Sequence, residues 1–222
     1  MSEETEIYSK DGSHKLVIYL DEDPCNPREW DNLSKIITNH KRYDFANESL
    51  ISPKKYDSWD ELYNEIEKIY EPVIVETIYM YDHSGITLSL SPFNCPWDSG
   101  RLGFIIVTKA DFEKEFGITK ETSEKEYNDC IKQALEVLKA EFKHYKHYAQ
   151  GDVFLASVYK LEKYTIKGDK IFEDRIESFD DYGVEEIEVE VFDPINGSEE
   201  LDQTIKKFKD KYGVEDSEQD MR

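Results

Sequence analysis

Two segments of the chain combine residue types that could activate a nucleophile. They read YDHSG at residues 81–85 and SPFNCPWDSG at residues 91–100. A histidine that is oriented by a carboxylate and contacts a hydroxyl group is the arrangement that makes a serine nucleophilic. His83 could form it with Asp98 and Ser99 if the two segments meet in the fold. The candidate catalytic residues of a small hydrolase or metal-dependent enzyme are therefore His83, Asp82, Asp98 and Ser99.

The same residues have a structural explanation, which we favour. Aspartate side chains hold tight turns by accepting backbone hydrogen bonds, and glycine supplies a positive φ. Asp82 and Asp98 would then cap the two turns, with Gly85 and Gly100 in left-handed conformations. Because the two segments are consecutive connections of one meander, they would lie at opposite ends of the sheet unless a bulge or a long crossing brings them together.

No metal or cofactor is expected. Glu141, His144 and His147 have the i, i+3 spacing of carboxylate–histidine metal sites, but no second helix offers matching ligands, so an exposed helix face is predicted. The three cysteines are too scattered for a zinc site or a disulfide framework, and we expect buried thiols. They are Cys25, Cys95 and Cys130. The chain also lacks the glycine-rich phosphate loops and the metalloprotease motif.

Alternation, capping residues and turn residues predict the elements that position these segments. Strands are expected at residues 14–20, 73–80, 86–91, 102–107, 153–161 and 185–192. Helices are expected at residues 28–40, 58–70, 108–117, 123–150 and 198–211. Ser58 is the predicted N-cap of the second helix, and Gly151 is a natural end for the longest one.

This order of elements predicts an α+β fold. We expect a mainly antiparallel sheet of about five strands, backed by the long helix, with an acidic C-terminal extension. The predicted organisation is a core domain at residues 1–163 and an acidic extension with a strand and a helix at residues 164–213. A disordered tail is expected at residues 214–222.

The 222-residue chain is strongly acidic, with 50 Asp+Glu against 28 Lys+Arg and a formal charge of −22. Nucleic acids and anionic lipids repel such a chain, so direct binding to either is not expected. No apolar run is long enough to cross a membrane, and the N-terminus does not resemble a signal peptide. A cytoplasmic location in the infected or host cell is therefore predicted.

The charge is concentrated in residues 173–202, which contain thirteen carboxylates and one basic residue. Solubility or a salt-rich host would explain this, and so would imitation of a nucleic-acid backbone. Glu186, Glu188 and Glu190 alternate with apolar residues and so share one face of a predicted strand. Carboxylates two residues apart on a strand are about 6.6–6.8 Å apart, close to every second phosphate of DNA at about 3.4 Å each.

The two turns resemble those of an uncharacterised protein family of bacteriophages and mobile elements. Further matches are DPCNPREWD at residues 23–31, HKRY at 40–43, GFIIV at 103–107, EFG at 115–117 and YAQGDV at 148–153. The family's later part reads DSCWGFYG, of which ESFDDYG at residues 177–183 is a weak echo. The resemblance covers roughly residues 15–160. It implies a mobile-element setting and no particular activity.

The leading hypothesis is a phage or mobile-element counter-defence protein, a non-enzymatic inhibitor. It would block the nucleic-acid-binding groove of a host nuclease of the restriction or CRISPR type. The alternatives are the enzyme described above and an interaction module that binds a basic host protein. Trp97 is the candidate surface anchor. The other predicted protein-binding residues are Asp180, Asp181, Glu185, Glu186, Glu188, Glu190, Asp193, Glu199 and Glu200.

Overall fold

The computed structural model describes residues 5–40, 42–43, 45–46, 55–172 and 175–214, with side chains described outside residues 163–185. The chain forms two compact units. Cys25–Gly151 is the motif unit, because it holds both turns of the sequence analysis. Met1–Pro24 and Asp152–Arg222 together form the hairpin unit. The motif unit is therefore inserted between the two parts of the hairpin unit.

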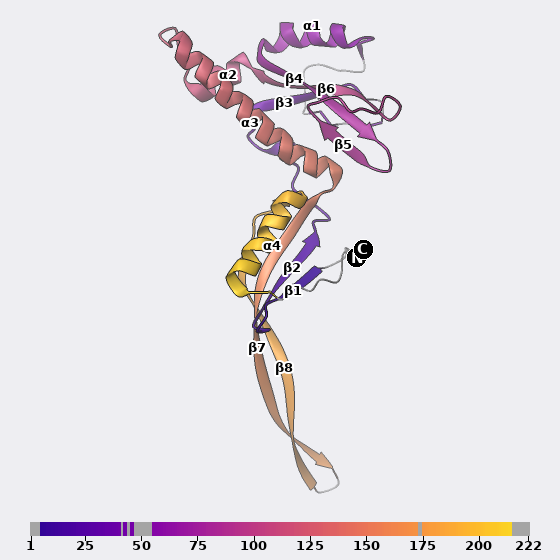
Figure 1. Ribbon diagram of the computed structural model, residues 1–222, viewed down its shortest axis with the longest axis vertical. Coiled ribbons are helices and arrows are strands. Elements are labelled where there is room, and N and C mark those ends of the chain that lie inside the picture. The colour runs from indigo at the N-terminus through magenta and orange to yellow at the C-terminus, as the bar shows by residue number, and fades with distance from the viewer. Residues whose placement is uncertain (1–4, 41, 44, 47–54, 173–174, 215–222) are drawn as a thin grey trace. The chain divides into compact units, whose positions relative to one another are not determined.

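The motif unit is built on a four-stranded antiparallel sheet in the order β3-β6-β4-β5. Its strands are β3 (Ser34–Thr38), β4 (Pro72–Asp82), β5 (Ile86–Ser89) and β6 (Ser99–Thr108). Helix α1 (Trp59–Tyr70) covers one face, whereas α2 (Lys109–Phe116) and α3 (Glu124–Gln150) cover the other (Figure 1). Because both faces are covered, residues 102–107 of β6 are all buried.

Capping residues define the helix ends in the way that the sequence predicts. The side chain of Ser58 accepts a hydrogen bond from the backbone N–H of Glu61 at the start of α1. Ser123 and Glu126 form a reciprocal capping box at the start of α3, and Gly151 ends that helix with a φ of 69°. The predicted helices at residues 58–70, 108–117 and 123–150 are confirmed to within a residue or two.

The helix predicted at residues 28–40 is wrong. The segment forms a single 3₁₀ turn, η1 (Pro27–Glu29), followed by strand β3. Tertiary contacts explain this difference, because the Glu141 carboxylate on α3 accepts hydrogen bonds from the backbone N–H groups of Leu33 and Ser34 at 2.8 and 2.9 Å. These bonds fix the start of β3 beside β6, and local helix propensity does not prevail.

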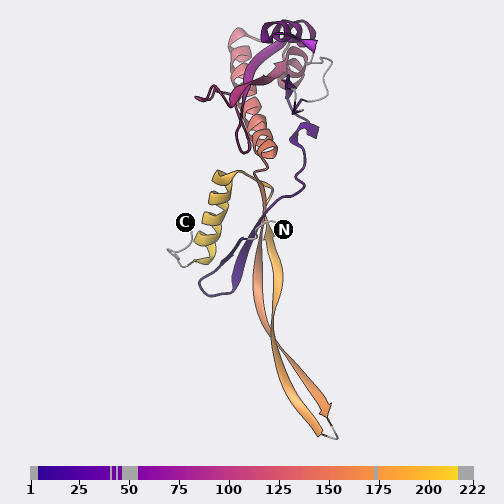
Figure 2. The same ribbon diagram turned by 90° about the vertical axis from the view of Figure 1, so that its right-hand side faces the viewer.

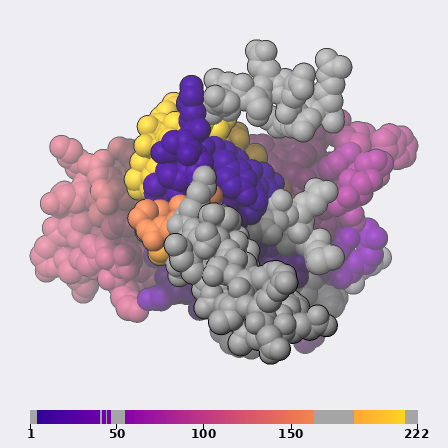
Figure 3. Space-filling model, turned by 90° about the horizontal axis from the view of Figure 1, so that it is seen from below, coloured from indigo at the N-terminus to yellow at the C-terminus, as the bar shows by residue number. Residues whose placement is uncertain are grey.

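The hairpin unit has a second antiparallel sheet in the order β1-β2-β7-β8, with β9 also paired to β7. Its strands are β1 (Thr5–Tyr8), β2 (His14–Leu20), β7 (Val153–Phe172), β8 (Arg175–Val191) and β9 (Ile195–Asn196). Helix α4 (Ser198–Tyr212) packs on one face, and Figure 3 shows it in yellow beside the indigo β1 and β2. The core consists of Leu16, Ile18, Ala156, Val158, Ile195 and Phe208.

Strands β7 and β8 continue well beyond this sheet. β7 pairs with β2 only as far as Lys160, but it pairs with β8 as far as Phe172. The outer part is therefore a two-stranded hairpin, which Figure 2 shows leaving the sheet. The strands predicted at residues 153–161 and 185–192 are confirmed, but each is the sheet end of a longer strand.

The α+β fold, the antiparallel pairing and the long helix are confirmed. The prediction of a single sheet is wrong, because residues 14–20 and 153–161 pair with each other and not with the strands of the motif unit. The two compact units also differ from the expected division after residue 163, where β7 runs on without a break. The disordered tail predicted at residues 214–222 lies almost wholly outside the described residues, which end at Val214. Among the described helices, none is long and apolar enough to cross a membrane.

Candidate functional site

The two turns of the motif unit meet at one end of its sheet. Strand β4 lies between β5 and β6, so residues 90–98 must cross from one side of β4 to the other. This crossing brings the second turn beside the first, and the backbone N–H of Asp82 donates to the carbonyl of Asp98 at 2.8 Å. The ring of Tyr81 lies 6.0 Å from that of His83 and 5.8 Å from that of Phe93, so aromatic contacts also join the turns.

The structure brings the predicted histidine and carboxylate together. His83 Nδ1 lies 3.3 Å from Asp98 Oδ2, and both side chains are largely exposed. The thiol of Cys95 contacts the same carboxylate oxygen at 3.9 Å. Asp82 faces elsewhere and forms an ion pair with Arg42 at 2.5 Å. Asp82 and Asp98 thus belong to two different pairs.

The nucleophile of the predicted triad is not in place. The Ser99 hydroxyl donates to the backbone carbonyl of Cys95. Within the part of the chain that the structure describes, no hydrogen bond joins Ser99 to His83. A serine nucleophile needs that contact, so the arrangement is a histidine–carboxylate pair without an activated hydroxyl. The turn geometry also differs from expectation, because Ser84 (φ 58°) and Gly85 (φ 155°) have positive φ and Gly100 does not.

A cavity of about 320 Å³ opens between the turns. Its lining residues are His40, Arg42, Met80, Asp82, Trp97, Asp98, Ser99, Gly100 and Arg101. Trp97 is 92% exposed, so the predicted surface anchor is indeed at the surface. The imidazole of His40 accepts backbone hydrogen bonds from Arg42 and Tyr43 at Nδ1. Burial and the charge of Arg42 lower the pKa of His40, which favours a neutral ring with its proton on Nε2.

A β-bulge positions Arg101 at this cavity. Ile78 pairs with Gly103 but Tyr79 pairs with Arg101, so Leu102 has no partner on β4. The bulge reverses the side-chain alternation of β6 and turns Arg101 toward the α1 side of the sheet, where its guanidinium lies over the rings of Trp59 and Phe104 at 5.6 and 5.8 Å.

Gly103, next to the bulge, lets β3 approach β6 closely. A Cβ atom at this position would lie 2.1 Å from the carbonyl oxygen of Ile37 and 2.7 Å from the Cα of Thr38 on the neighbouring β3. Only glycine allows the two backbones to approach this closely. The strand GFIIV is therefore constrained at its first residue by backbone packing.

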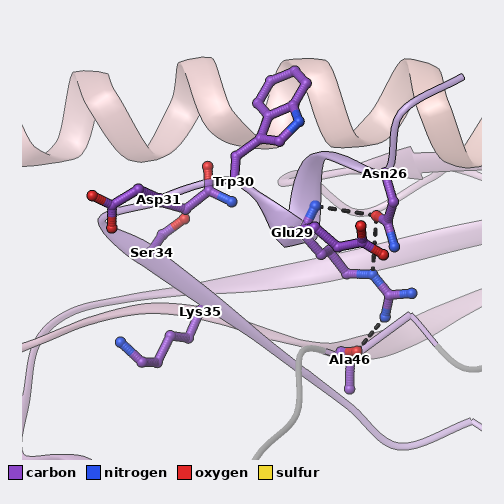
Figure 4. A pocket seen from close by; sticks show the side chains of 9 residues that line it. Asn26, Glu29, Trp30, Asp31, Ser34, Lys35 and Ala46 are labelled. Atoms are coloured by element: carbon purple, nitrogen blue, oxygen red, sulfur yellow. Dashed lines mark hydrogen bonds between the residues drawn. The ribbon is translucent and has the colours of Figure 1, made fainter.

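A second concave surface of about 520 Å³ lies over the segment before β3. Figure 4 shows Trp30 pointing toward α3, where its ring meets the His144 ring edge-on at 5.9 Å, whereas Lys35 points away from that helix. Arg28 donates to the carbonyl of Ala46 and lies over the Tyr145 ring. Lys35 is paired with Asp111. These contacts hold the loop in place, so the surface is chiefly structural.

The carboxylate of the metal-like spacing on α3 is also structural. Glu141 accepts backbone hydrogen bonds at the start of β3. The prediction that it lies on an exposed helix face is therefore wrong. His144 Nδ1 is buried, and no residue that the structure describes forms a hydrogen bond with it. Among the described residues, no group of three or more His, Cys, Asp or Glu could hold a metal ion. The three cysteines are free, and the prediction of buried thiols is wrong, because Cys25 is exposed and Cys95 and Cys130 are only half-buried.

The acidic row on β8 is divided between two faces of the sheet. Glu186 pairs with Lys15 at 2.8 Å, and Glu190 pairs with Lys211 of α4 at 2.7 Å. A bulge between Val158 and Tyr159 in the β7–β8 register reverses the alternation, so Glu190 turns toward α4 whereas Glu186 turns away from it. The prediction that the three glutamates share one face is therefore wrong.

The remaining predicted binding residues are distributed as follows. Glu188 accepts a hydrogen bond from the hydroxyl of Tyr159 at 3.1 Å. Asp193 and Glu199 are exposed, whereas Glu200 accepts from the backbone N–H of Asn196 at 3.0 Å and so braces the start of α4. The side chains of Asp180, Asp181 and Glu185 lie outside the described residues, and their backbone belongs to β8.

Sequence reasoning missed the two arginines of the cavity. Arg101 directly follows the turn at residues 91–100, and Arg42 lies in the HKRY segment, so both were adjacent to the motifs. It also missed Lys15, which is 6% exposed and contacts Glu6 and Glu186 at 2.7 and 2.8 Å. A lysine within an apolar strand was the available signal, because a buried lysine needs carboxylate partners.

No protein-family model matches the chain, and searches of curated proteins and of solved structures found no similar protein.

Proposed function

We propose that the chain is a non-enzymatic inhibitor from a phage or mobile element that binds a basic host protein through strand β8. The proposed target is a defence nuclease of the restriction or CRISPR type, and the proposed contact is its nucleic-acid-binding groove. The mobile-element setting comes from the resemblance of the two turns. The observation that carries the binding proposal is the exposed edge of β8.

Strand β8 has the properties of a docking strand. In the described part of the chain, no strand pairs with its outer edge. Its apolar residues Ile187, Val189 and Val191 are 38%, 47% and 65% exposed. Such an edge offers backbone hydrogen bonds and alternating side chains to an incoming chain. These exposed apolar residues favour docking to a protein, because a surface that only imitated the charge of a nucleic acid would not need them.

Charge would select a basic partner. The hairpin unit contains 28 acidic and 12 basic residues, a net −16. Exposed ion pairs such as Glu190–Lys211 contribute only about 0–1 kcal/mol, so an arginine of the partner can replace the internal lysine at little cost. The net charge would speed the encounter with a basic groove and make it sensitive to salt.

The geometry gives less support to the two alternatives. A hydrolase needs an activated nucleophile, and the Ser99 hydroxyl donates to a backbone carbonyl instead. An interaction module that binds a basic protein outside any nucleic-acid site uses the same strand. Only competition with DNA separates it from the inhibitor.

The test is a pulldown from host-cell lysate at low salt and at about 0.5 M salt, where exposed charge pairs are largely screened, with and without excess duplex DNA. We expect capture of a nuclease that both DNA and salt displace. The bait variant replaces Glu185, Glu186, Glu188 and Glu190 by Gln and should lose this capture. A matched variant makes the same charge change at exposed Glu115, Glu121, Glu124 and Glu136 and should keep it.

Three results would contradict the proposal. Capture that is indifferent to DNA would establish the interaction module in its place. Equal loss in both variants would mean that total charge acts, without a role for β8. Empty beads under all conditions would remove the support for a host partner.

A further inference from the structure

We propose that the cavity between the two turns binds a small molecule that carries a planar ring and one anionic group. Arg101 would hold the anionic group and Trp97 would hold the ring. This site belongs to the motif unit and is independent of the binding proposed for β8.

Arg101 has the charge and the N–H groups needed to bind an anion. The other arginine of the cavity, Arg42, is neutralised by Asp82 at 2.5 Å. Among the described residues, no carboxylate pairs with Arg101, whose guanidinium lies over the rings of Trp59 and Phe104. The two ring contacts restrict the guanidinium without using its N–H groups, which can donate to the two oxygens of a carboxylate or phosphate.

Trp97 offers a flat apolar wall beside this charge. It is 92% exposed and lines the cavity. A fully exposed indole loses the free energy that burial of an aromatic side chain provides. Nucleobases bind to exposed aromatic side chains by stacking, with little dependence on which base it is. The exposed ring therefore favours a planar partner.

The remaining polar groups would fix the orientation of the ligand. Asp98 supplies carboxylate acceptors for a ring N–H or a hydroxyl, and it is itself placed by His83 at 3.3 Å. His40 offers a donor at Nε2, because its Nδ1 accepts two backbone hydrogen bonds. The volume of about 320 Å³ is at the lower end of the range for ligand pockets, which indicates a ligand of the size of a mononucleotide or an aromatic acid.

The bulge at Leu102 and Gly103 gives an independent reason to regard this arrangement as a site. Without the extra residue, the alternation of β6 would put Arg101 on the other face of the sheet. The residue after the unpaired Leu102 is Gly103, where a side chain would clash with the backbone of β3. Bulges of this kind are common where a strand must re-aim a side chain next to a functional site.

The experiment is calorimetric titration of the full chain with four probes, combined with tryptophan fluorescence. The probes are adenosine 5′-monophosphate and indole-3-acetate, each beside its neutral counterpart, adenosine and indole-3-acetamide. We expect at least one anionic probe to bind tenfold or more tightly than its neutral counterpart. Preference for the first probe would identify a phosphate ligand, and preference for the second would identify a carboxylate ligand.

Variants then assign the roles. Arg101→Gln should abolish the preference for the anion, and Arg101→Lys should retain part of it because the charge remains. Trp97→Ala should weaken the binding of the anionic probe and of its neutral counterpart by a similar factor. Lys132→Gln removes an exposed charge of the same unit away from the cavity and should leave binding unchanged.

The proposal is overturned if no anionic probe binds to the wild-type chain at millimolar concentration. It is also overturned if Arg101→Gln retains the preference for the anion while its thermal unfolding midpoint equals that of the wild type. Should that variant fail to fold, Arg101→Lys and Trp97→Ala decide the matter by the same criteria.

Discussion

The motif unit packs helices against both faces of its sheet, whereas the hairpin unit packs α4 on one face and buries a lysine on the other. In the motif unit, Leu62 and Phe112 are completely buried on opposite sides of the sheet. In the hairpin unit, Leu16 faces α4 while the adjacent Lys15 faces the other way and is 6% exposed. The motif unit has a net charge of −6 from 16 basic and 22 acidic residues, against −16 in the hairpin unit.

Because of this difference, the two units should respond differently to changes in pH and salt. A sheet with two apolar faces gains most of its stability from area removed from water, which salt and pH hardly change. A sheet with one small apolar core and a buried lysine depends in addition on carboxylates that must stay ionised. The hairpin unit should therefore be the first to unfold when pH changes or when its core is damaged.

The largest expected effect comes from truncating the core of one unit at a time. Phe208→Ala removes a buried ring from the small core of the hairpin unit and should cost about 3–5 kcal/mol. We expect the hairpin unit to unfold first in urea, while the motif unit keeps its wild-type transition. All three tryptophans, Trp30, Trp59 and Trp97, lie in the motif unit, so their fluorescence reports that unit alone.

The measurement is urea unfolding followed by far-ultraviolet circular dichroism and by tryptophan fluorescence. For Phe208→Ala, circular dichroism should show an early transition that fluorescence does not. For the matched Phe112→Ala, fluorescence should move to lower urea concentration. A single transition that coincides for both probes in both variants would mean that the two units unfold as one.

A smaller effect is expected from the bulge of the motif unit. Gly103→Ala places a methyl group 2.1 Å from the Ile37 carbonyl oxygen, and separation of β3 from β6 should cost roughly 3 kcal/mol. Gly100→Ala, in the same strand, meets nothing within 4 Å and should cost less than about 1 kcal/mol. Chemical denaturation monitored by tryptophan fluorescence compares the two. Equal stability of both variants would contradict the close approach of β3.

The smallest of the three effects on stability is expected from the buried lysine of the hairpin unit. Lys15→Met removes the cation between Glu6 and Glu186 and should cost about 1–2 kcal/mol at neutral pH, a reduced value because both carboxylates are partly exposed. Lys160→Met changes an exposed lysine of β7 and should stay within about 0.5 kcal/mol of the wild type.

The pH dependence of the Lys15 effect has a definite sign. Burial opposes the charge of Lys15, but the hydrogen bonds that it donates to Glu186 and Glu6 outweigh burial and raise the pKa of Lys15. Its contribution is therefore present below the unfolded pKa of about 10.4 and is lost as pH rises through the folded pKa. The hydrogen bond from Lys15 lowers the pKa of Glu6. The contribution of the Lys15–Glu6 pair to stability is therefore lost as pH falls below about 4.3. Thermal unfolding between pH 3 and 11 should show the largest difference from the wild type near neutrality, and a constant difference would contradict this.

Local signals predicted the elements well, and long-range pairing could not be read from them. Ser58, Ser123 and Gly151 mark helix ends through contacts within a few residues of themselves. The strand at residues 34–38 depends on Glu141, more than a hundred residues away, and no local pattern contains that contact. No local pattern indicated the two bulges either, which changed the face of Arg101 on β6 and of the predicted binding residue Glu190 on β8.

For the candidate site, residue types were predicted better than roles. The sequence indicated that His83, Asp98 and Ser99 could meet, and the crossing of residues 90–98 does bring them to one end of the sheet. It did not indicate that Ser99 would donate to a backbone carbonyl or that Arg101 would stack on two rings. Such roles depend on side-chain orientation, which the spacing of residues does not determine.

The insertion of one unit into the other has a consequence for biosynthesis. Leu20 pairs with Phe154, and the backbone N–H of Asp21 donates to the carbonyl of Val153 at 2.8 Å, so the two ends of the inserted segment leave neighbouring strands side by side. The ribosome makes β1 and β2 first, but β7, the second partner of β2, emerges only after the whole motif unit. If the motif unit folds as it emerges, it shortens the loop that β2 and β7 must close and lowers the entropy cost of their pairing. Among the described strands, β2 therefore has only β1 as a partner until the middle of the chain has been made.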